Sequence, residues 1–189
     1  MYVSFRLSYD KRAFGKLYTD TTNVKNVQGQ NCLGKNSTDR GRLATKVAIL
    51  SDDYQFPLSI AYCPGNTPDI KTVPDLLSNV NVPLRNDRRV VLNLIADKAY
   101  TCKPTHALRK ELGGYGIKLI VEPKKNALNK KFTRCSAELM KTRHSIENYF
   151  AITKASNKRC RLRYDRYITS FRAHYVMVPM LKACKYLFG

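Results

Sequence analysis

Short apolar stretches separated by polar turns divide the first third of the chain into three predicted strands. Residues 16–22 are rich in β-branched side chains, and two apolar stretches, 43–50 and 56–63, are separated by the polar sequence SDDYQ. Runs of this composition, bounded by turn residues, are typical of β-strands. Three consecutive strands joined by turns or loops predict an antiparallel meander.

The middle of the chain has the order expected of a parallel strand pair. After the segment PGNTPD and a short predicted helix ending in PDLLSN, residues 89–96 form an apolar run typical of a strand buried on both faces. Pro104 suits the first turn of the next helix, and Gly113 and Gly114 end it. The strand IKLIVE then completes a predicted β-α-β crossover.

Two longer helices are predicted in the last third, over about 136–157 and 165–187, after the basic loop PKKNALNKKF. At about 100° per residue, four apolar side chains gather on one side of the first helix and predict its core face: Leu139, Ile146, Tyr149 and Phe150. A chain of 189 residues is long enough for one sizeable core and short for two. We therefore expect one α/β domain.

The charge of the chain indicates a polyanionic partner. Lys and Arg number 34 against 14 Asp and Glu, so the net charge is +20, and the basic residues are spread along the whole sequence. Nucleic acid is the polyanion that such a surface most commonly meets. The alternative is a solvated basic surface without a specific partner, but self-repulsion at this charge destabilises a compact state unless something offsets it.

Cysteine spacing and the N-terminal sequence indicate an intracellular protein. No two of the six cysteines are closer than 24 residues, which excludes a local zinc knuckle and suggests no disulfide framework. The N-terminal sequence MYVSFRLSYDKRAF carries charges throughout and lacks a signal-peptide core. No apolar run approaches the length of a membrane span. We expect no membrane partner and a location with DNA, in the cytoplasm or nucleus according to the host.

One acid in the predicted helix 136–157 has an unusual setting. Arg143, Glu147 and Lys154 share a stripe beside the apolar face, so Glu147 is predicted to be partly buried against the sheet between two cations. The alternative is a surface ion pair between Arg143 and Glu147, which is worth only ~0.3–0.5 kcal/mol.

Two aspartates occupy equally informative positions. Asp20 lies inside a predicted strand, where Asp is disfavoured, and Asp97 directly follows the apolar strand 89–96. Taken singly, Asp20 can mark a sheet edge or bend, and Asp97 can be a turn or cap residue. Together with Glu147 on a basic protein, they predict a two-metal phosphoryl-transfer site, because carboxylates bind Mg²⁺ or Mn²⁺ and paired ions ~3.5–4 Å apart stabilise in-line displacement.

These residues belong to blocks whose order resembles the catalytic domain of DDE transposases from bacterial insertion sequences. The blocks are LYTDTTNVK with Asp20, then DRGRLATKVAIL and FPLSIAYCPGNTPD with its Gly-x-x-x-Asp turn, then LIADKAY with Asp97. In the last of these, Ala99 stands where the family commonly has Gly. The final helix, YDRYITSFRAHYVMVPML, resembles the family's closing helix, and the likeness runs from about residue 16 to 187.

The helix with Glu147 carries the family signature of Tyr, Arg, Glu and Lys separated by two, three and six residues. Arg143, Glu147 and Lys154 fit this spacing, and Met140 stands in place of the Tyr.

The resemblance implies a ribonuclease H-like mixed sheet, with an antiparallel three-strand meander plus parallel strands and flanking helices. It implies hydrolysis at a transposon end and transfer of the freed 3′-hydroxyl to target DNA, with Mg²⁺ or Mn²⁺ held by Asp20, Asp97 and Glu147. Arg143 and Lys154 would contact DNA phosphates, and the weaker candidates are Lys46, Lys98, Lys124 and Lys125. Transposon ends and target DNA would be the partners, and the resemblance allows a homodimer.

Other chemistries lack their sequence motifs. The chain has no P-loop, no His-Glu-x-x-His and no Gly-x-Ser-x-Gly, its three histidines are scattered, and nothing marks the nucleophile of a Ser or Tyr recombinase. Because only 19 residues precede Asp20, we expect residues 1–15 to be an N-terminal remnant and 16–189 to be the catalytic domain. Two alternatives are a non-catalytic DNA-binding remnant of a decayed transposase and a ribonuclease H-fold nuclease.

Overall fold

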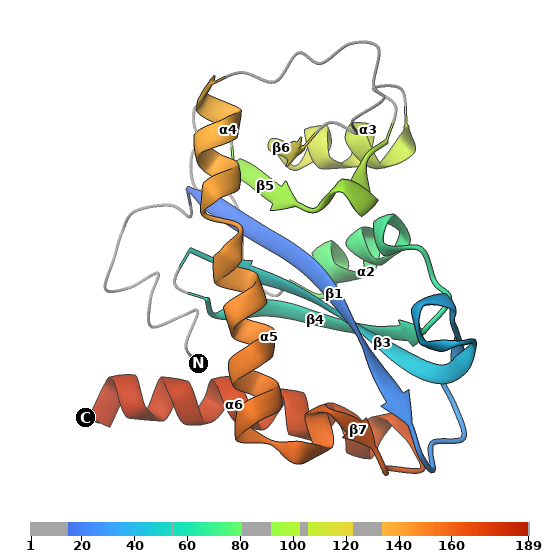
Figure 1. Cartoon of the computed structure of the whole chain (residues 1–189). Helices are drawn as coiled ribbons and strands as arrows, with labels where there is room; N and C mark the ends of the chain where they lie inside the picture. Colours follow the sequence, from blue (N-terminus) through green and yellow to red (C-terminus); the bar gives the residue numbers. More distant parts are fainter. Residues whose placement is uncertain (1–14, 54, 81–91, 103–105, 123–133, 189) are drawn as a thin grey trace.

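One mixed sheet with helices on both faces forms the body of the molecule (Figure 1). The computed structural model describes most of the chain, in five ranges: 15–53, 55–80, 92–102, 106–122 and 134–188. Of the seven strands in the described ranges, five follow the order β2-β3-β1-β5-β6, and the other two lie off this path, with β4 paired to β3 and β7 paired to β1. The expected mixed α/β class is confirmed, with an antiparallel meander and parallel strands in one sheet flanked by helices.

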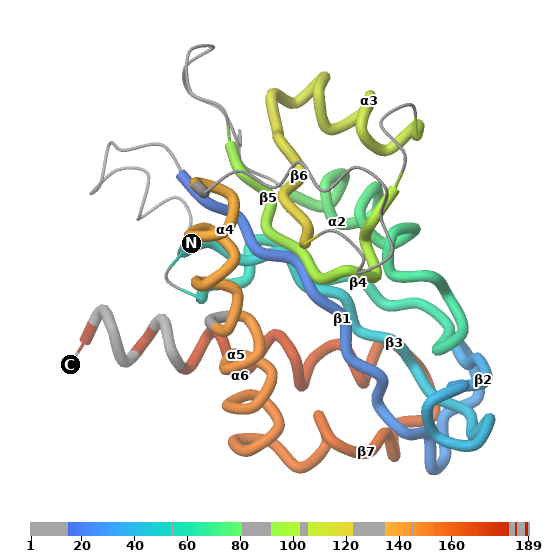
Figure 2. The backbone as a smooth tube through the Cα atoms, turned by 45° about the horizontal axis from the view of Figure 1, so that its top comes forward, coloured from blue at the N-terminus to red at the C-terminus, as the bar shows by residue number. Residues whose placement is uncertain are grey.

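The predicted antiparallel meander is present and is longer than the sequence pattern indicated. Strand β1 (Lys16–Asn26) pairs antiparallel with β3 (Arg42–Asp52), which pairs antiparallel with β4 (Pro57–Pro64) on its other side. A short strand, β2 (Gly34–Asn36), also pairs with β3 and was not predicted. Strand β1 therefore lies in the interior of the sheet (Figure 2).

The predicted β-α-β crossover is also confirmed. Strand β5 (Leu92–Ala96), helix α3 (Ala107–Gly114) and strand β6 (Ile117–Val121) follow one another, and β5 pairs parallel with both β6 and β1. Helix α3 begins at Ala107, with the His106 ring accepting a hydrogen bond from the Leu108 N–H. The Pro104 expected in its first turn lies outside the described ranges.

Side chains alternate between two cores, as the pleat of a sheet requires. On one face Leu17, Leu94 and Ala96 pack with helices α2 (Val73–Ser78) and α3. On the opposite face, residues of the sheet such as Tyr18 and Ile95 pack with helices α5 (His144–Ser156) and α6 (Ile168–Phe188). The predicted core face of the helix is confirmed, because Ile146, Tyr149 and Phe150 are buried and Leu139 is partly buried.

The single helix predicted over 136–157 is wrong in one respect, because two helices replace it. Helix α4 (Arg134–Lys141) ends before α5 begins, with Thr142 and Arg143 in a turn between them. The Thr142 hydroxyl donates to the Leu139 carbonyl at 2.7 Å and accepts from the buried Tyr18 hydroxyl at 2.9 Å. A side chain that hydrogen-bonds its own backbone competes with the helical ladder, and here it is also tied to β1.

A buried arginine connects the last strand, β7 (Leu162–Arg163), to the rest of the sheet. Arg163 is fully buried, and its guanidinium donates to the Thr45 hydroxyl at 2.6 Å and to Asn31 carbonyl and side-chain oxygens at 2.7 and 2.8 Å. It also donates to the carbonyls of Asp165 and Arg166. Because β7 pairs with β1, this side chain ties the end of the central strand to the start of α6.

Four short 3₁₀ helices complete the described elements: η1 (Ser37–Asp39), η2 (Asp69–Thr72), η3 (Lys98–Tyr100) and η4 (Lys158–Cys160). All six cysteines are free thiols. In the part of the chain that the structure covers, no helix is both long and apolar enough to span a membrane.

Candidate active site at the centre of the sheet

Asp20 lies in the middle of the central strand. It shares the face of β1 with Tyr18 and Val24, which pack on the α5–α6 side, so its carboxylate emerges toward α5. The Thr21 N–H donates to Asp20 Oδ1 at 2.8 Å. Asp20 pairs with Ile49 of β3 on one side and lies just beyond Tyr18, the last residue of β1 that pairs with β5.

The parallel register brings Asp97 beside Asp20. Tyr18 pairs with Ile95 across β1 and β5, and continuing this register by two residues sets Asp20 opposite Asp97. Neighbouring strands lie about 4.8 Å apart. Asp97 also caps η3, because its Oδ1 accepts from the Lys98 N–H at 2.6 Å, so the cap role considered from the sequence is present as well.

The acidity of Asp20 reflects this crowding. The pKa of its carboxyl is raised to about 6, chiefly by burial and to a smaller extent by the negative charges of Asp97 and Asp69, whereas the Thr21 N–H and the charge of Arg143 oppose the rise. Two adjacent carboxylates in a half-buried place favour either a shared proton or a cation.

Glu147 faces a different partner. Its side chain is 52% exposed, so the predicted partial burial against the sheet is wrong. Arg143 donates to Glu147 Oε1 at 2.5 Å, which is the ion pair that we considered as the alternative. Arg143 lies before α5 and is also close enough to affect the pKa of Asp20. Across the described ranges, no three His, Cys, Asp or Glu side chains are grouped closely enough to hold a metal ion.

The other predicted DNA-contacting residues are placed as follows. Lys154 Nζ donates to the Thr22 hydroxyl on β1 at 2.6 Å, and burial lowers its pKa. Lys98 forms an ion pair with Glu122 at 2.8 Å, and both side chains are about half exposed. Lys46 is buried, with its ammonium bound to the Asp69 carboxylate and the Thr67 carbonyl. Lys124 and Lys125 lie outside the described residues.

The sequence did not single out Asp69 for a role at this site. Its Oδ1 accepts from the Thr21 hydroxyl at 2.8 Å and from the ammonium of Lys46. Thr21 follows Asp20 in β1 and points to the other face of the sheet, so Asp69 contacts β1 next to Asp20 but on that other face. The Gly-x-x-x-Asp turn of the sequence marks this position, but its contact with β1 depends on the pairing of β3 between them.

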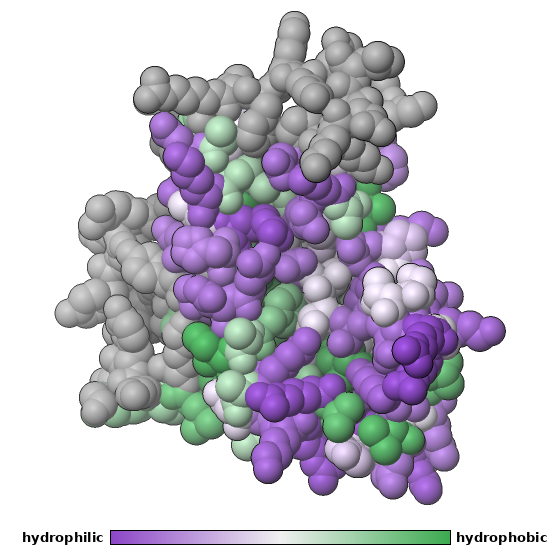
Figure 3. Space-filling model, in the orientation of Figure 1, coloured by the Kyte–Doolittle hydropathy of each residue, from purple (hydrophilic) through white to green (hydrophobic). Residues whose placement is uncertain are grey.

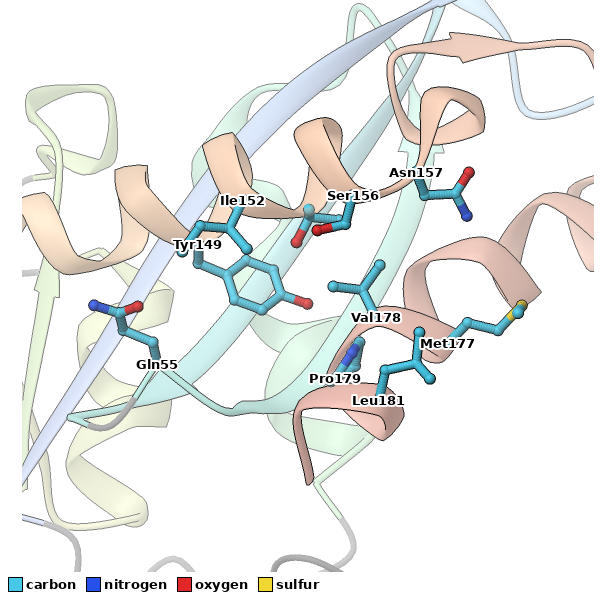
Figure 4. A pocket seen from close by; sticks show the side chains of 10 residues that line it. Gln55, Tyr149, Ile152, Ser156, Asn157, Met177, Val178, Pro179 and Leu181 are labelled. Atoms are coloured by element: carbon cyan, nitrogen blue, oxygen red, sulfur yellow. The ribbon is translucent and has the colours of Figure 1, made fainter. Parts of the chain in front are cut away.

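An apolar pocket between α5 and α6 is a separate feature. Its volume is about 500 Å³, and Tyr149, Ile152, Pro179 and Leu181 contribute to its lining (Figure 4). None of the residues that line it is a carboxylate. The acids therefore meet at the sheet and not in this pocket.

The donor set at the sheet suits a hard cation. Asp20 and Asp97 offer carboxylate oxygens side by side, and these are the ligands that Mg²⁺ and Mn²⁺ prefer. Glu147 can add a third carboxylate only by leaving Arg143. The arrangement fits phosphodiester chemistry better than nucleophilic catalysis, because the described residues around Asp20 are acids, threonines and cations.

A family model described as "Transposase DDE domain" matches residues 17–177. No curated protein matches the chain. Solved structures that resemble it include a piggyBac transposase synaptic complex with hairpin DNA, at 15% identity and a TM-score of 0.44 over 62% of this chain and 24% of that one.

Another similar structure is the catalytic domain of Mos1 mariner transposase, at 11% identity and a TM-score of 0.41 over 78% of this chain and 84% of that one. Of the piggyBac transposase chain, by contrast, this chain spans only about a quarter. The family model covers most of the described residues.

Proposed function

Because the chain belongs to the transposase DDE domain family, we propose that it is a catalytic domain that cleaves DNA at transposon ends and joins the freed 3′-hydroxyl to target DNA. The observation that carries this proposal is the parallel register that brings Asp20 and Asp97 together at the centre of the sheet. The family match does not favour the two alternatives, a decayed DNA-binding remnant and a nuclease of the same fold.

Asp20, Asp97 and Glu147 are the residues that would hold Mg²⁺ or Mn²⁺. Bound ions supply activation of the attacking oxygen and neutralise charge on the phosphate in the transition state. Asp20 and Asp97 are supported as ligands by their adjacency and by the raised pKa of Asp20. A carboxyl with a pKa of about 6 gives up its proton readily near neutral pH when a cation is offered.

Glu147 would take part by exchanging its partner. Its carboxylate is paired with Arg143, and the charge of Arg143 also lowers the pKa of Asp20. Arg143 thus links Glu147 to Asp20 and Asp97, and its guanidinium is a group that binds phosphate well. When DNA enters, Arg143 would turn to a phosphate oxygen and release Glu147 to the metal. Both movements use side chains that are partly exposed.

Four cations are proposed to position the DNA, with unequal support. Arg143 just before α5 and Lys154 within α5 lie near Asp20, and Lys98 directly follows Asp97. Lys46 would act indirectly, because its buried ammonium binds the Asp69 carboxylate. Residues 16–189 are the proposed catalytic domain, its DNA partners are transposon ends and target, and a homodimer stays a prediction.

Replacing the third acid tests the proposed site. We expect Glu147→Gln to abolish Mg²⁺- or Mn²⁺-dependent nicking of supercoiled plasmid and strand transfer from a 3′-hydroxyl duplex taken from the DNA flanking the gene. DNA affinity in EDTA should stay within about twofold, since an exposed pair contributes little. Gel assays of cleavage and joining, with binding measured by fluorescence anisotropy, give both results.

Glu111→Gln is the matched control, because Glu111 is an exposed glutamate on α3. The control should cleave as the wild type does. Wild-type activity in Glu147→Gln would overturn the assignment of the site.

A further inference from the structure

A basic segment of ten residues follows α5 and has an alternating arrangement of buried and exposed side chains. In this segment, residues 158–167, Cys160 and Arg163 are fully buried. The exposed side chains are four cations and two tyrosines: Lys158, Arg159, Arg161, Tyr164, Arg166 and Tyr167. Figure 3 shows hydrophilic side chains over the lower end of α5, where this segment begins.

The one acid of the basic segment is turned away from solvent. The Asp165 side chain is only 11% exposed, and it lies 3.6 Å from the Arg159 guanidinium and 3.3 Å from the His174 ring. An inward acid among outward cations leaves a surface of one charge sign. Asp165 is occupied by Arg159 and His174, so the other exposed cations of the segment stay free of it, and such a surface favours an anionic partner.

The backbone of the basic segment is held rigidly. The Arg163 carbonyl accepts from the Val27 N–H at 2.9 Å, and the Tyr175 hydroxyl donates to the Cys160 carbonyl at 3.0 Å. The Gln30 N–H donates to the Arg166 carbonyl at 2.9 Å. A fixed backbone presents its cations in one geometry, which lowers the entropy lost on binding.

A continuous line of contacts leads from the acids to this segment. Lys154 binds Thr22, two residues beyond Asp20 on the same face of β1, and Arg161 Nε donates to the Lys154 carbonyl at 2.7 Å. Lys25 of β1 then pairs with Leu162 of β7. From Asp20 to Lys25 the strand spans roughly 17 Å, at about 3.3 Å per residue.

We propose that the basic segment is a second DNA-binding surface, which holds backbone phosphates of the duplex about five nucleotides from the phosphodiester that reacts. The distance follows from the length of β1 and the roughly 3.4 Å rise per nucleotide along the axis of a duplex that runs beside this strand. Lys158, Arg161 and Arg166 contact phosphates, and the hydroxyls of Tyr164 and Tyr167 donate to them. This inference rests on the proposed function, since it places the duplex by the reacting bond.

A charge-matched pair of variants tests the surface without catalysis. Lys158→Ala/Arg166→Ala removes two cations of the basic segment, and Lys110→Ala/Lys118→Ala removes two exposed cations from α3 and β6. Both variants are titrated in EDTA with a fluorescent random-sequence DNA duplex of about 20 base pairs, longer than the roughly five-nucleotide span. Thermal unfolding checks that each variant is folded.

We expect the segment variant to bind roughly 30-fold more weakly near 0.15 M salt, with the slope of log K against log salt reduced by about 1.8, because each phosphate contact contributes about 0.9. The control should change both quantities much less. An equal loss in the two variants, or no loss in the segment variant, would overturn the proposal. A loss of affinity for single-stranded RNA alone would assign the surface to RNA and overturn it too.

A second arm locates the contact. In a strand-transfer duplex, neutral methylphosphonate linkages about five nucleotides from the joined end should weaken binding by the wild type and not by the segment variant. Equal weakening of both proteins contradicts the assigned distance. Because the EDTA measurement needs no cleavage, it still holds if the metal site is assigned wrongly.

Discussion

At the scale of single residues, Asp20 is ionised at an energetic cost. Its carboxyl is held in a half-buried place next to another acid, and burial raises its pKa to about 6. In the unfolded chain an aspartate has a pKa of about 3.9. The folded state therefore binds this proton more tightly than the unfolded state, and the charge opposes folding at neutral pH.

We expect Asp20→Asn to stabilise the metal-free protein by at most about 3 kcal/mol at pH 7. This limit is the difference between the pKa values of Asp20 in the folded and unfolded chain, converted at ~1.36 kcal/mol for each tenfold change in the acid dissociation constant. The gain should be largest above pH 6 and should disappear as the pH falls toward 4, where the wild-type carboxyl is protonated. Urea unfolding at several pH values in EDTA measures this difference.

Asp39→Asn is a suitable control for that series, since the Asp39 side chain is 40% exposed on η1. Its free energy of unfolding should follow that of the wild type across the pH range. A pH-independent difference between Asp20→Asn and the wild type would contradict the link to the Asp20 carboxyl.

At the scale of elements, the turn between α4 and α5 is fixed from the sheet. Tyr18 is almost fully buried, and its hydroxyl reaches Thr142 across 124 residues of sequence. This bond sets where α5 begins, and so where Arg143 and Glu147 lie relative to the strand that carries Asp20.

A double-mutant cycle tests this link. We expect Tyr18→Phe and Thr142→Val each to lower the free energy of unfolding by about 1 kcal/mol, with a coupling energy of about 0.5–1.5 kcal/mol, because one shared hydrogen bond is lost in either case. Urea unfolding of the wild type, both single variants and the double variant gives the coupling. Strictly additive losses would show that the two hydroxyls act independently.

The elements that the sequence predicted are those whose signal is local. The strands of the meander and the crossover appear as apolar runs between turn residues, and the structure confirms them. Strands β2 and β7 have only three and two residues, and they are defined by their pairing with β3 and β1. Segments this short show no hydrophobic periodicity from which a strand could be predicted. The break before α5 was missed because its cause, the contact between Thr142 and Tyr18, is tertiary.

At the scale of the whole molecule, charge opposes compactness. A net charge of +20 on 189 residues repels itself. We expect the thermal midpoint to rise when NaCl increases from about 0.05 to 0.5 M, since the Debye length falls from roughly 14 to 4 Å. Differential scanning calorimetry measures it, and a midpoint that falls with salt would show that attractive ion pairs dominate.

Duplex DNA should raise the thermal midpoint at low salt much more than at high salt, because a ligand that binds only the folded state stabilises it. This is the companion measurement to the salt series.

The site could be predicted from the sequence only as a set of candidates. Asp20 and Asp97 are unusual within their own segments, but their adjacency depends on the register between β1 and β5, which no local pattern specifies. The pair of Glu147 with Arg143 is local and could be considered from the sequence, whereas the pairing of Lys46 with Asp69 depends on distances across the fold. For that reason the cations predicted to contact DNA include one that is buried.

The buried Arg163 has a consequence for the order in which the protein is made. Asn31 and Thr45, which accept its hydrogen bonds, are synthesised early, but they receive this partner only after more than a hundred further residues. A nascent chain cannot complete the end of its central strand until β7 has left the ribosome. Premature termination between residues 148 and 162 therefore leaves a chain that contains Asp20, Asp97 and Glu147 but lacks the guanidinium that joins β1 to α6.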